Sequence, residues 1–135
     1  MSNMSIIHIW IGTTRKTEEE YLKYFELDYS TEGDFDAPGY KLCPFCKGIN
    51  QRWYDEDLIG IIPLFGDEYP ILQLLETIPI DKNEIEKVIG YCRSVGLDFG
   101  NAIFYYTDAE LWIDNSTRKT YNGLKYIGRY RSCLR

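Results

Sequence analysis

The pattern of apolar and polar positions predicts several β-strands along the chain. Residues 5–12 (SIIHIWIG) are nearly all apolar and β-branched, which is typical of a central strand covered on both faces. The apolar run at 58–65 (LIGIIPLF) fits either a strand or a buried helical turn, because its periodicity does not distinguish the two. Strand-like composition returns in the C-terminal third, at 102–107 (AIFYYT), 110–114 (ELWID) and 124–131 (LKYIGRYR). Asp108 and Ala109 would form a tight turn between the first two of these strands.

Helical periodicity predicts three helices between these strands. Their ranges are 17–29, 71–78 and 82–95. Thr17 and Glu20 have the spacing of a capping box at the start of the first helix. Asp81 can cap the third helix, and Gly96 can end it.

The order of these elements predicts the fold class. Helices group in the middle of the chain and strands at its end, which is typical of an α+β domain. We expect residues 1–135 to form a single domain, with helices packed on a mainly antiparallel β-sheet that ends in a C-terminal β-meander. Residues 30–41 are rich in glycine, proline and acidic residues, and predict a loop.

The charge of the chain is unevenly distributed. Residues 1–114 carry all 21 acidic side chains against 9 Lys and Arg, a net charge of −12, whereas residues 115–135 carry +6. An acidic body repels nucleic acid and attracts basic partners. The six basic residues match no nucleic-acid-binding motif, so we expect no nucleic-acid partner. We also expect no membrane partner and a cytoplasmic location, since no signal peptide or membrane-spanning run is evident.

The four cysteines leave several interpretations open. Cys43 and Cys46 have the C-x-x-C spacing of a thiol-redox pair, and they could also supply two zinc ligands. A structural zinc site needs four ligands, whereas Cys92 and Cys133 occur singly. Reduced structural thiols are the third interpretation. His8, the single histidine, lies in an apolar strand and is expected to be a hydrogen-bonded core residue.

No sequence motif supports catalysis or cofactor binding. The chain contains neither a phosphate-binding glycine motif nor a nucleophile elbow. We therefore expect that the protein is not an enzyme and binds no cofactor or metal.

The segment 53–57 combines aromatic and acidic residues. Asp55 or Asp57 could cap a helix, or the two carboxylates could act together in acid–base chemistry or cation binding. Acids beside Trp53 and Tyr54 also resemble an interaction surface for a cationic groove. The preceding loop would add to the same negative field if it lies nearby, through Glu32, Asp34 and Asp36.

Several segments resemble the immunity protein 22 family. They are Ile9-Trp10-Ile11-Gly12, Glu19-Glu20-Tyr21 with Tyr24-Phe25, Phe45-Cys46-Lys47, the stretch from Trp53 to Asp57, and the AIFYY strand. The resemblance implies a bacterial immunity protein of a polymorphic toxin system, which neutralises its cognate toxin by direct stoichiometric binding. It also implies a toxin of the nuclease type, which is frequent in such systems.

On this interpretation, Asp55 and Asp57 would pair with Arg or Lys of the toxin, while Trp53 and Tyr54 would fill pockets on it. The full set of expected toxin-binding residues is Trp53, Tyr54, Asp55, Glu56 and Asp57, with Glu32, Asp34 and Asp36 as secondary members. One alternative is a small thiol-redox or zinc-binding protein that uses the pair at 43 and 46. Another is an adaptor that binds an acidic partner through the basic C-terminal strand.

Overall fold

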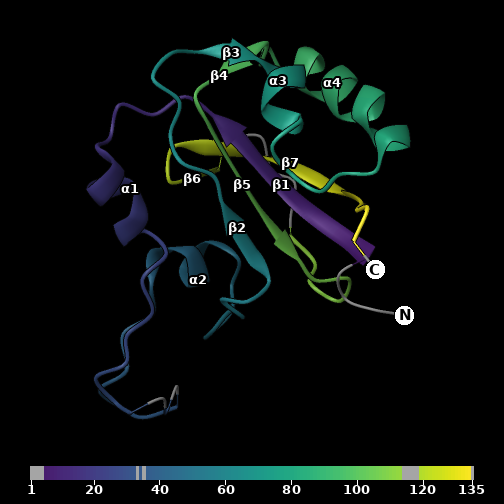
Figure 1. Ribbon diagram of the computed structural model, residues 1–135. Coiled ribbons are helices and arrows are strands. Elements are labelled where there is room, and N and C mark those ends of the chain that lie inside the picture. Colours follow the sequence, from purple (N-terminus) through teal and green to yellow (C-terminus); the bar gives the residue numbers. More distant parts are fainter. Residues whose placement is uncertain (1–4, 33, 35, 114–118, 135) are drawn as a thin grey trace. The chain divides into compact units, whose positions relative to one another are not determined.

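The computed structural model describes residues 5–32, 34, 36–113 and 119–134, and divides them between two compact units (Figure 1). We call residues 15–56 the loop unit and the remainder, 1–14 with 57–135, the sheet unit. The loop unit contains α1 (Glu18–Lys23) and α2 (Pro44–Gly48). The strands of the sheet unit are β1 (Ile6–Gly12), β2 (Ile59–Ile61), β3 (Tyr69–Pro70), β4 (Phe99–Gly100), β5 (Ala102–Thr107), β6 (Thr120–Tyr121) and β7 (Leu124–Arg131). Its helices are α3 (Ile71–Leu75), the 3-10 helix η2 (Lys82–Glu84) and α4 (Ile85–Ser94).

The sheet unit is organised around β1. The five-stranded sheet has the order β2-β5-β1-β7-β6, and β3 and β4 form a separate two-stranded sheet. β1 pairs antiparallel with both β5 and β7, so that Trp10 lies opposite Phe104 on one side and Tyr126 on the other. Residues 7–12 are all buried, which confirms the predicted central strand.

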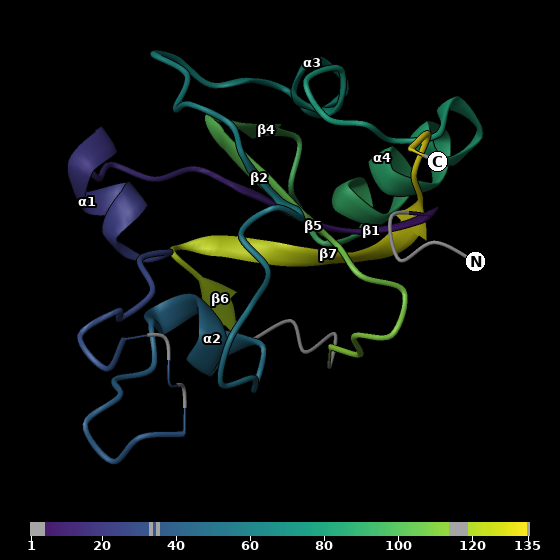
Figure 2. The same ribbon diagram turned by 60° about the horizontal axis from the view of Figure 1, so that its bottom comes forward.

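One face of the sheet packs against α3 and α4, as two views of the ribbon show (Figures 1 and 2). The odd-numbered side chains of β1 point to this face because successive residues of a strand alternate in direction. The buried cluster on this face consists of Ile7, Ile9, Ile11, Ile71, Leu74, Leu75, Ile78, Ile80, Val88, Cys92, Ile103 and Ile127. The i, i+3, i+4 spacing of 71, 74 and 75 predicted this apolar side of α3.

The opposite face of the sheet is aromatic. The Trp10 ring stacks on Phe104 at a centroid distance of 4.7 Å. It also contacts Tyr126 at 5.1 Å and Tyr121 at 5.8 Å. These separations are in the range in which aromatic pairs add stability beyond the burial of their area. Trp10 is therefore a core residue, as expected from its place in an apolar strand.

His8 lies fully buried beside this aromatic group, with both ring nitrogens hydrogen-bonded. Nε2 is 2.8 Å from the backbone oxygen of Asp108, which can only accept, so Nε2 carries the proton. Nδ1 then accepts a hydrogen bond from the Tyr126 hydroxyl at 2.7 Å. Burial lowers the pKa of His8, and the positive charge of Arg129 acts in the same direction, while the bond to Asp108 opposes both. The expectation of a hydrogen-bonded core histidine is confirmed.

A bulge in β7 shifts its register against β1. Ile9 pairs with Gly128, but the next residue, Trp10, pairs with Tyr126, so Ile127 has no opposite residue on β1. Gly128 adopts a φ of +130°, a conformation that side-chain-bearing residues rarely take. The bulge lets Ile127 face the helices while Tyr126 contacts Trp10 on the other side of the sheet.

The predicted α+β class with a mainly antiparallel sheet is confirmed, but the C-terminal meander is wrong. β5 and β7 flank β1 and are not neighbours, and residues 110–113 form no strand, while Asp114 lies outside the described residues. Side chains hold the chain after β5 in a turn: Asp108 accepts from the Glu110 N–H at 2.9 Å, and Arg129 donates to the Ala109 oxygen at 2.8 Å.

The remaining predictions differ from the structure mainly in their boundaries. The ambiguous run at 58–65 contains the short strand β2, which pairs with β5. α3 ends at Leu75, before the predicted limit at 78, and the predicted helix 82–95 begins with η2 before it continues as α4. No helix among the described ranges is long and apolar enough to cross a membrane.

Substituting Gly128 with alanine should destabilise the protein by about 1–3 kcal/mol, because the bulge requires a φ that alanine adopts only with strain. Gly90→Ala is the matched control, since a Cβ at this exposed position of α4 meets no atom within 4 Å. It should be neutral or stabilise by up to about 1 kcal/mol through helix propensity. Urea unfolding of both variants measures the difference, and equal effects would contradict the role of the bulge.

The stability of the protein should fall on acidification through the range in which an unfolded histidine titrates, near pH 6.5. The unfolded chain takes up a proton there that buried His8 resists, so the free energy of unfolding decreases as the pH falls. The slope contributed by one group is at most about 1.4 kcal/mol per pH unit. Urea unfolding between about pH 7.5 and 5.5 should give a steeper slope in the wild type than in His8→Gln, and the difference between the two slopes is the contribution of His8.

Carboxyl groups with a lowered pKa affect the stability at lower pH, so their contribution can be separated from that of His8. The pKa of Glu84 is lowered chiefly by the N–H of Arg131, so its contribution is lost below the usual titration range of a glutamate, near pH 4.5. A direct check is the NMR titration of the single imidazole. A midpoint at or above 6.5 in the folded protein would contradict the assignment.

Candidate functional site

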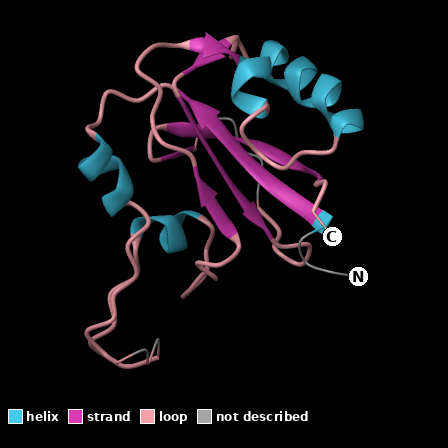
Figure 3. Cartoon of the chain, viewed as in Figure 1, coloured by secondary structure: helices cyan, strands magenta, loops and turns pink. Residues whose placement is uncertain are grey.

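The loop unit contains little regular structure beyond its two short helices (Figure 3). The predicted capping box is present at the start of α1: the Thr17 hydroxyl accepts from the Glu20 N–H at 3.2 Å, and the Glu20 carboxylate accepts from the Thr17 N–H at 3.3 Å. The helix ends at Lys23, however, and not at residue 29. Asp28 accepts hydrogen bonds from the N–H groups of Ser30 and Lys41, at 3.0 and 2.9 Å, which favours a turn over further helix.

The interior of the loop unit is an aromatic cluster around Phe45 of α2. The Phe45 ring lies 5.7 Å from Phe25 and 5.0 Å from Tyr54, which it meets edge to face. Tyr24 is 6.2 Å away and its backbone oxygen accepts from the Phe45 N–H at 3.1 Å. These contacts tie α1, α2 and the 53–56 segment together within the unit.

Tyr54 belongs to this interior. Its side chain is only 2% exposed, and its hydroxyl donates to the backbone oxygen of Phe25. Burial raises the pKa of the Tyr54 phenol well above its usual value. A residue that fills a pocket on a partner must expose its ring, so the structure gives Tyr54 a supporting position behind the surface and leaves Trp53, which is 43% exposed, on it.

The acidic residues of the 53–57 segment lie outside any helix or strand. No helix begins at Asp55 or Asp57, so their interpretation as helix caps is wrong, and the segment turns before β2. Asp55 is partly buried and Glu56 is exposed, both in the loop unit, whereas exposed Asp57 is the first residue of the second segment of the sheet unit.

The loop at 28–41 is joined to the segment 52–56 by three side-chain interactions. The Tyr29 hydroxyl donates to the Glu56 carboxylate, and the Tyr40 hydroxyl donates to the backbone oxygen of Arg52 at 2.7 Å. The Asp36 carboxylate lies 3.3 Å from the Arg52 guanidinium and remains 90% exposed. Asp36 therefore lies near the 53–56 segment, as a shared negative field requires.

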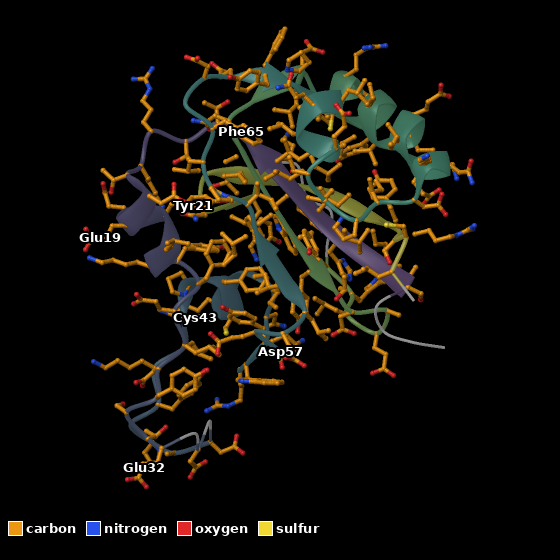
Figure 4. The ribbon with its side chains drawn as sticks, in the orientation of Figure 1. Glu19, Tyr21, Glu32, Cys43, Asp57 and Phe65 are labelled. Atoms are coloured by element: carbon orange, nitrogen blue, oxygen red, sulfur yellow. The ribbon has the colours of Figure 1, made fainter. Side chains whose placement is uncertain are left out.

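Glu32 and Asp34 lie further along the same loop and are exposed. Figure 4 shows Glu32 far from Cys43, at the outer end of the loop unit. The Asp34 carboxylate accepts from the Asp36 N–H at 3.0 Å, and its backbone oxygen accepts from the Thr31 hydroxyl at 2.8 Å. Both hydrogen bonds join residues that are two or three positions apart in the chain.

Tyr29, the last residue of the predicted helix 17–29, is a surface residue in a loop. It is 55% exposed, and its bond to the Glu56 carboxylate raises the pKa of its phenol to about 12. The signal that could have placed it in a loop is Asp28 followed two residues later by Ser30, a spacing typical of an Asx turn. We define the acidic surface as Tyr29, Asp36, Trp53, Asp55 and Glu56.

The cysteines divide between the two units. Cys43 and Cys46 are buried, and their sulfur atoms lie 2.9 Å apart at the start of α2. In the sheet unit, Cys92 is buried in the core and Cys133 is exposed. Within the described part of the chain, no group of three or more His, Cys, Asp or Glu side chains is arranged to hold a metal ion.

One charged side chain of the basic C-terminal strand, Arg129, makes contacts within the sheet unit. The Arg129 guanidinium lies 5.0 Å from the centre of the Trp112 ring and also donates to the Ala109 oxygen. Arg118 and Arg135 lie outside the described residues. An acidic partner that binds this strand would therefore compete for Arg129 with Trp112 and the Ala109 oxygen.

Comparison with known protein families decides the identity of the chain. The sequence profile of the family described as Immunity protein 22 matches residues 7–131 of 135. The chain belongs to the Immunity protein 22 family. The match spans both units and confirms the resemblance seen in the sequence. The family name denotes an immunity protein, a class that acts by binding a cognate toxin. No curated protein and no solved structure matches the chain.

Replacing Tyr54 with phenylalanine should lower the free energy of unfolding of this immunity protein by about 1 kcal/mol. The variant keeps the ring in the aromatic cluster but removes the hydroxyl that bonds the Phe25 oxygen in a buried setting. Tyr29→Phe loses an exposed hydrogen bond and should cost less, because water can satisfy the Glu56 carboxylate. Urea unfolding of the two variants provides the measurement, and a larger loss for Tyr29→Phe would contradict the assignment.

Proposed function

We propose that the protein neutralises a bacterial toxin domain by forming a stoichiometric complex with it, without catalysis. The observation that carries this proposal is the family match over residues 7–131. The protein then has a single macromolecular partner, the toxin domain, which binds to one of its surfaces.

The acidic surface of the loop unit is the best candidate for the interface. Residues 15–56 contain ten acidic and six basic side chains. The exposed rings of Tyr29 and Trp53 lie in the same segments as the carboxylates of Asp36, Asp55 and Glu56. Aromatic anchors combined with charged groups are typical of the residues that dominate binding energy at interfaces. Glu32 and Asp34 of the same unit add exposed negative charge, and exposed Asp57 follows Glu56 directly in the chain.

A toxin of the nuclease type fits this surface electrostatically. Nucleases bind the phosphate backbone through clefts that carry Lys and Arg. Carboxylates placed on an exposed surface can occupy the same positions as phosphates, and their field accelerates association with a cationic partner. We therefore propose that Asp55 and Asp57 pair with basic side chains of such a cleft, while Trp53 packs into it.

The internal bonds of the loop unit support rapid and tight binding. The bonds of Tyr29 to Glu56 and of Tyr40 to Arg52 hold the loop at 28–41 beside the 52–56 segment before a partner arrives. A preformed surface loses less conformational entropy on binding than a disordered one. The Asp36–Arg52 pair is largely exposed, so Asp36 can exchange its partner for a toxin arginine at little cost.

The test begins with purification of the tagged protein from its native bacterium and identification of a stoichiometric partner by mass spectrometry. The dissociation constant of that complex is then measured for Asp55→Asn/Asp57→Asn, which leaves the Glu56–Tyr29 bond intact. We expect weakening of about 30-fold or more, since removing paired interface charges costs about 2–5 kcal/mol. The effect should shrink as salt screens the charges.

Asp67→Asn/Glu76→Gln is the matched control, because it removes the same charge from exposed positions elsewhere in the sheet unit. It should change the dissociation constant only a few-fold, through long-range steering. Equal effects of the two double variants would overturn the proposed interface. If no toxin domain co-purifies with the tagged protein, the proposed function is wrong.

A further inference from the structure

The loop unit contains a pair of thiols that lie outside the acidic surface. Cys43 is the N-cap of α2 and Cys46 is the third residue of the helix, so the C-x-x-C spacing brings both sulfur atoms to the same side. The two Sγ atoms are 2.9 Å apart and hydrogen-bonded. Cys43 Sγ also accepts from the backbone N–H of Cys46 at 3.2 Å. Neither cysteine forms a disulfide bond.

We propose that Cys43 and Cys46 form a redox modification site, which closes to an intramolecular disulfide on reaction with a peroxide and reopens with thiols. The proposal is independent of the toxin-binding function. It rests on the contact between the two sulfur atoms and on their shared hydrogen-bond geometry.

The chemistry balances with hydrogen peroxide as the two-electron oxidant. The Cys43 thiolate attacks one peroxide oxygen, the O–O bond breaks, and hydroxide leaves to give a sulfenic acid on Cys43. The Cys46 sulfur then attacks the Cys43 sulfur, the S–O bond breaks, and water is released as the disulfide forms. In sum, two thiols and one peroxide give one disulfide and two waters. Two external thiols reverse the oxidation and become a disulfide themselves.

The hydrogen bonds assign the roles of the two thiols. The contact with the Cys46 sulfur is the main cause that lowers the pKa of Cys43 to about 7; burial opposes it, and the backbone N–H groups of Cys46 and Phe45 lower it further. The same contact, together with burial, raises the pKa of Cys46. Cys43 is therefore the nucleophile at neutral pH, and Cys46 is the resolving thiol.

Burial favours a small oxidant. Cys43 and Cys46 are 3% and 0% exposed, so a bulky disulfide could reach them only after local opening of the unit. Hydrogen peroxide is hardly larger than a water molecule and needs far less opening. Phe45, between the two cysteines, contacts Phe25 and Tyr54, so oxidation occurs at the centre of the loop unit.

The unmodified chain allows a direct test by peptide mass. Trypsin cuts after Lys41 and Lys47, so Cys43 and Cys46 share one peptide, whereas Cys92 and Cys133 fall in two others. The folded protein is treated with graded hydrogen peroxide, denatured, alkylated with iodoacetamide and digested. We expect the peptide 42–47 to lose two hydrogen atoms and both alkylation sites, and to regain them after dithiothreitol.

Cys92 provides the matched control as a buried thiol whose pKa burial raises to about 12. The pair should be half-oxidised at a peroxide dose at least about tenfold below the dose that modifies Cys92, because the thiolate is the reactive form. A peptide 42–47 that keeps both thiols while exposed Cys133 is oxidised would overturn the proposal. So would sulfinic acid on Cys43 without a disulfide, or a stoichiometric zinc ion bound to the two thiols in the purified protein.

Single variants test the order of the steps. In Cys46→Ser, the Cys43 sulfenic acid cannot be resolved, so dimedone should label Cys43 after peroxide treatment. In Cys43→Ser, dimedone should leave Cys46 unlabelled. Circular dichroism verifies that each variant is folded. If a variant does not fold, the peptide-mass test on the wild-type protein still decides the proposal. Equal labelling of the two variants would overturn the assignment of Cys43 as the nucleophile.

Discussion

The sheet unit depends on the burial of β1. A strand whose two faces are both covered needs a hydrogen-bonded neighbour on each edge and apolar contacts on each side, and for β1 both neighbours and the apolar layer on the helix side come from its own unit. β5 and β7 supply the neighbours, α3 and α4 cover one face, and the aromatic rings around Trp10 fill the other. The single polar side chain in this arrangement between residues 6 and 12, His8, is accommodated because Tyr126 and the Asp108 backbone satisfy both of its nitrogens.

The loop unit is held together in a different way. Its two helices are too short to be stable alone, so its shape depends on the aromatic cluster around Phe45 and on side-chain bonds between distant segments. Such a unit can present carboxylates and rings from several loops on one surface. Loops positioned by a small core are a common way to build a binding site, which fits the toxin recognition proposed for this member of the immunity protein family.

The thiol pair gives the same unit a second chemical property. The two sulfur atoms in contact at the start of α2 belong to residues on either side of Phe45 in the chain, and the Phe45 ring is the centre of the aromatic cluster. Their short spacing means that a disulfide would close a loop of only a few residues, so its main effect is local. The acidic surface and the thiol pair thus occupy one small unit, and the partners proposed for them, a toxin and a peroxide, differ.

The elements whose signal is local could be predicted from the sequence. The apolar run of β1, the capping box at Thr17, the apolar spacing of α3 and the strands at 102–107 and 124–131 follow from periodicity and hydrogen-bonding chemistry of neighbouring residues. The family was also evident from the order of short motifs. The structure alone decided that β1 lies between β5 and β7, because strand order depends on pairing between residues about a hundred positions apart. It likewise decided that Tyr54 turns inward while Tyr29 faces solvent beside Glu56, since two tyrosines of equal hydrophobicity are distinguished only by the neighbours that the folded chain brings to them.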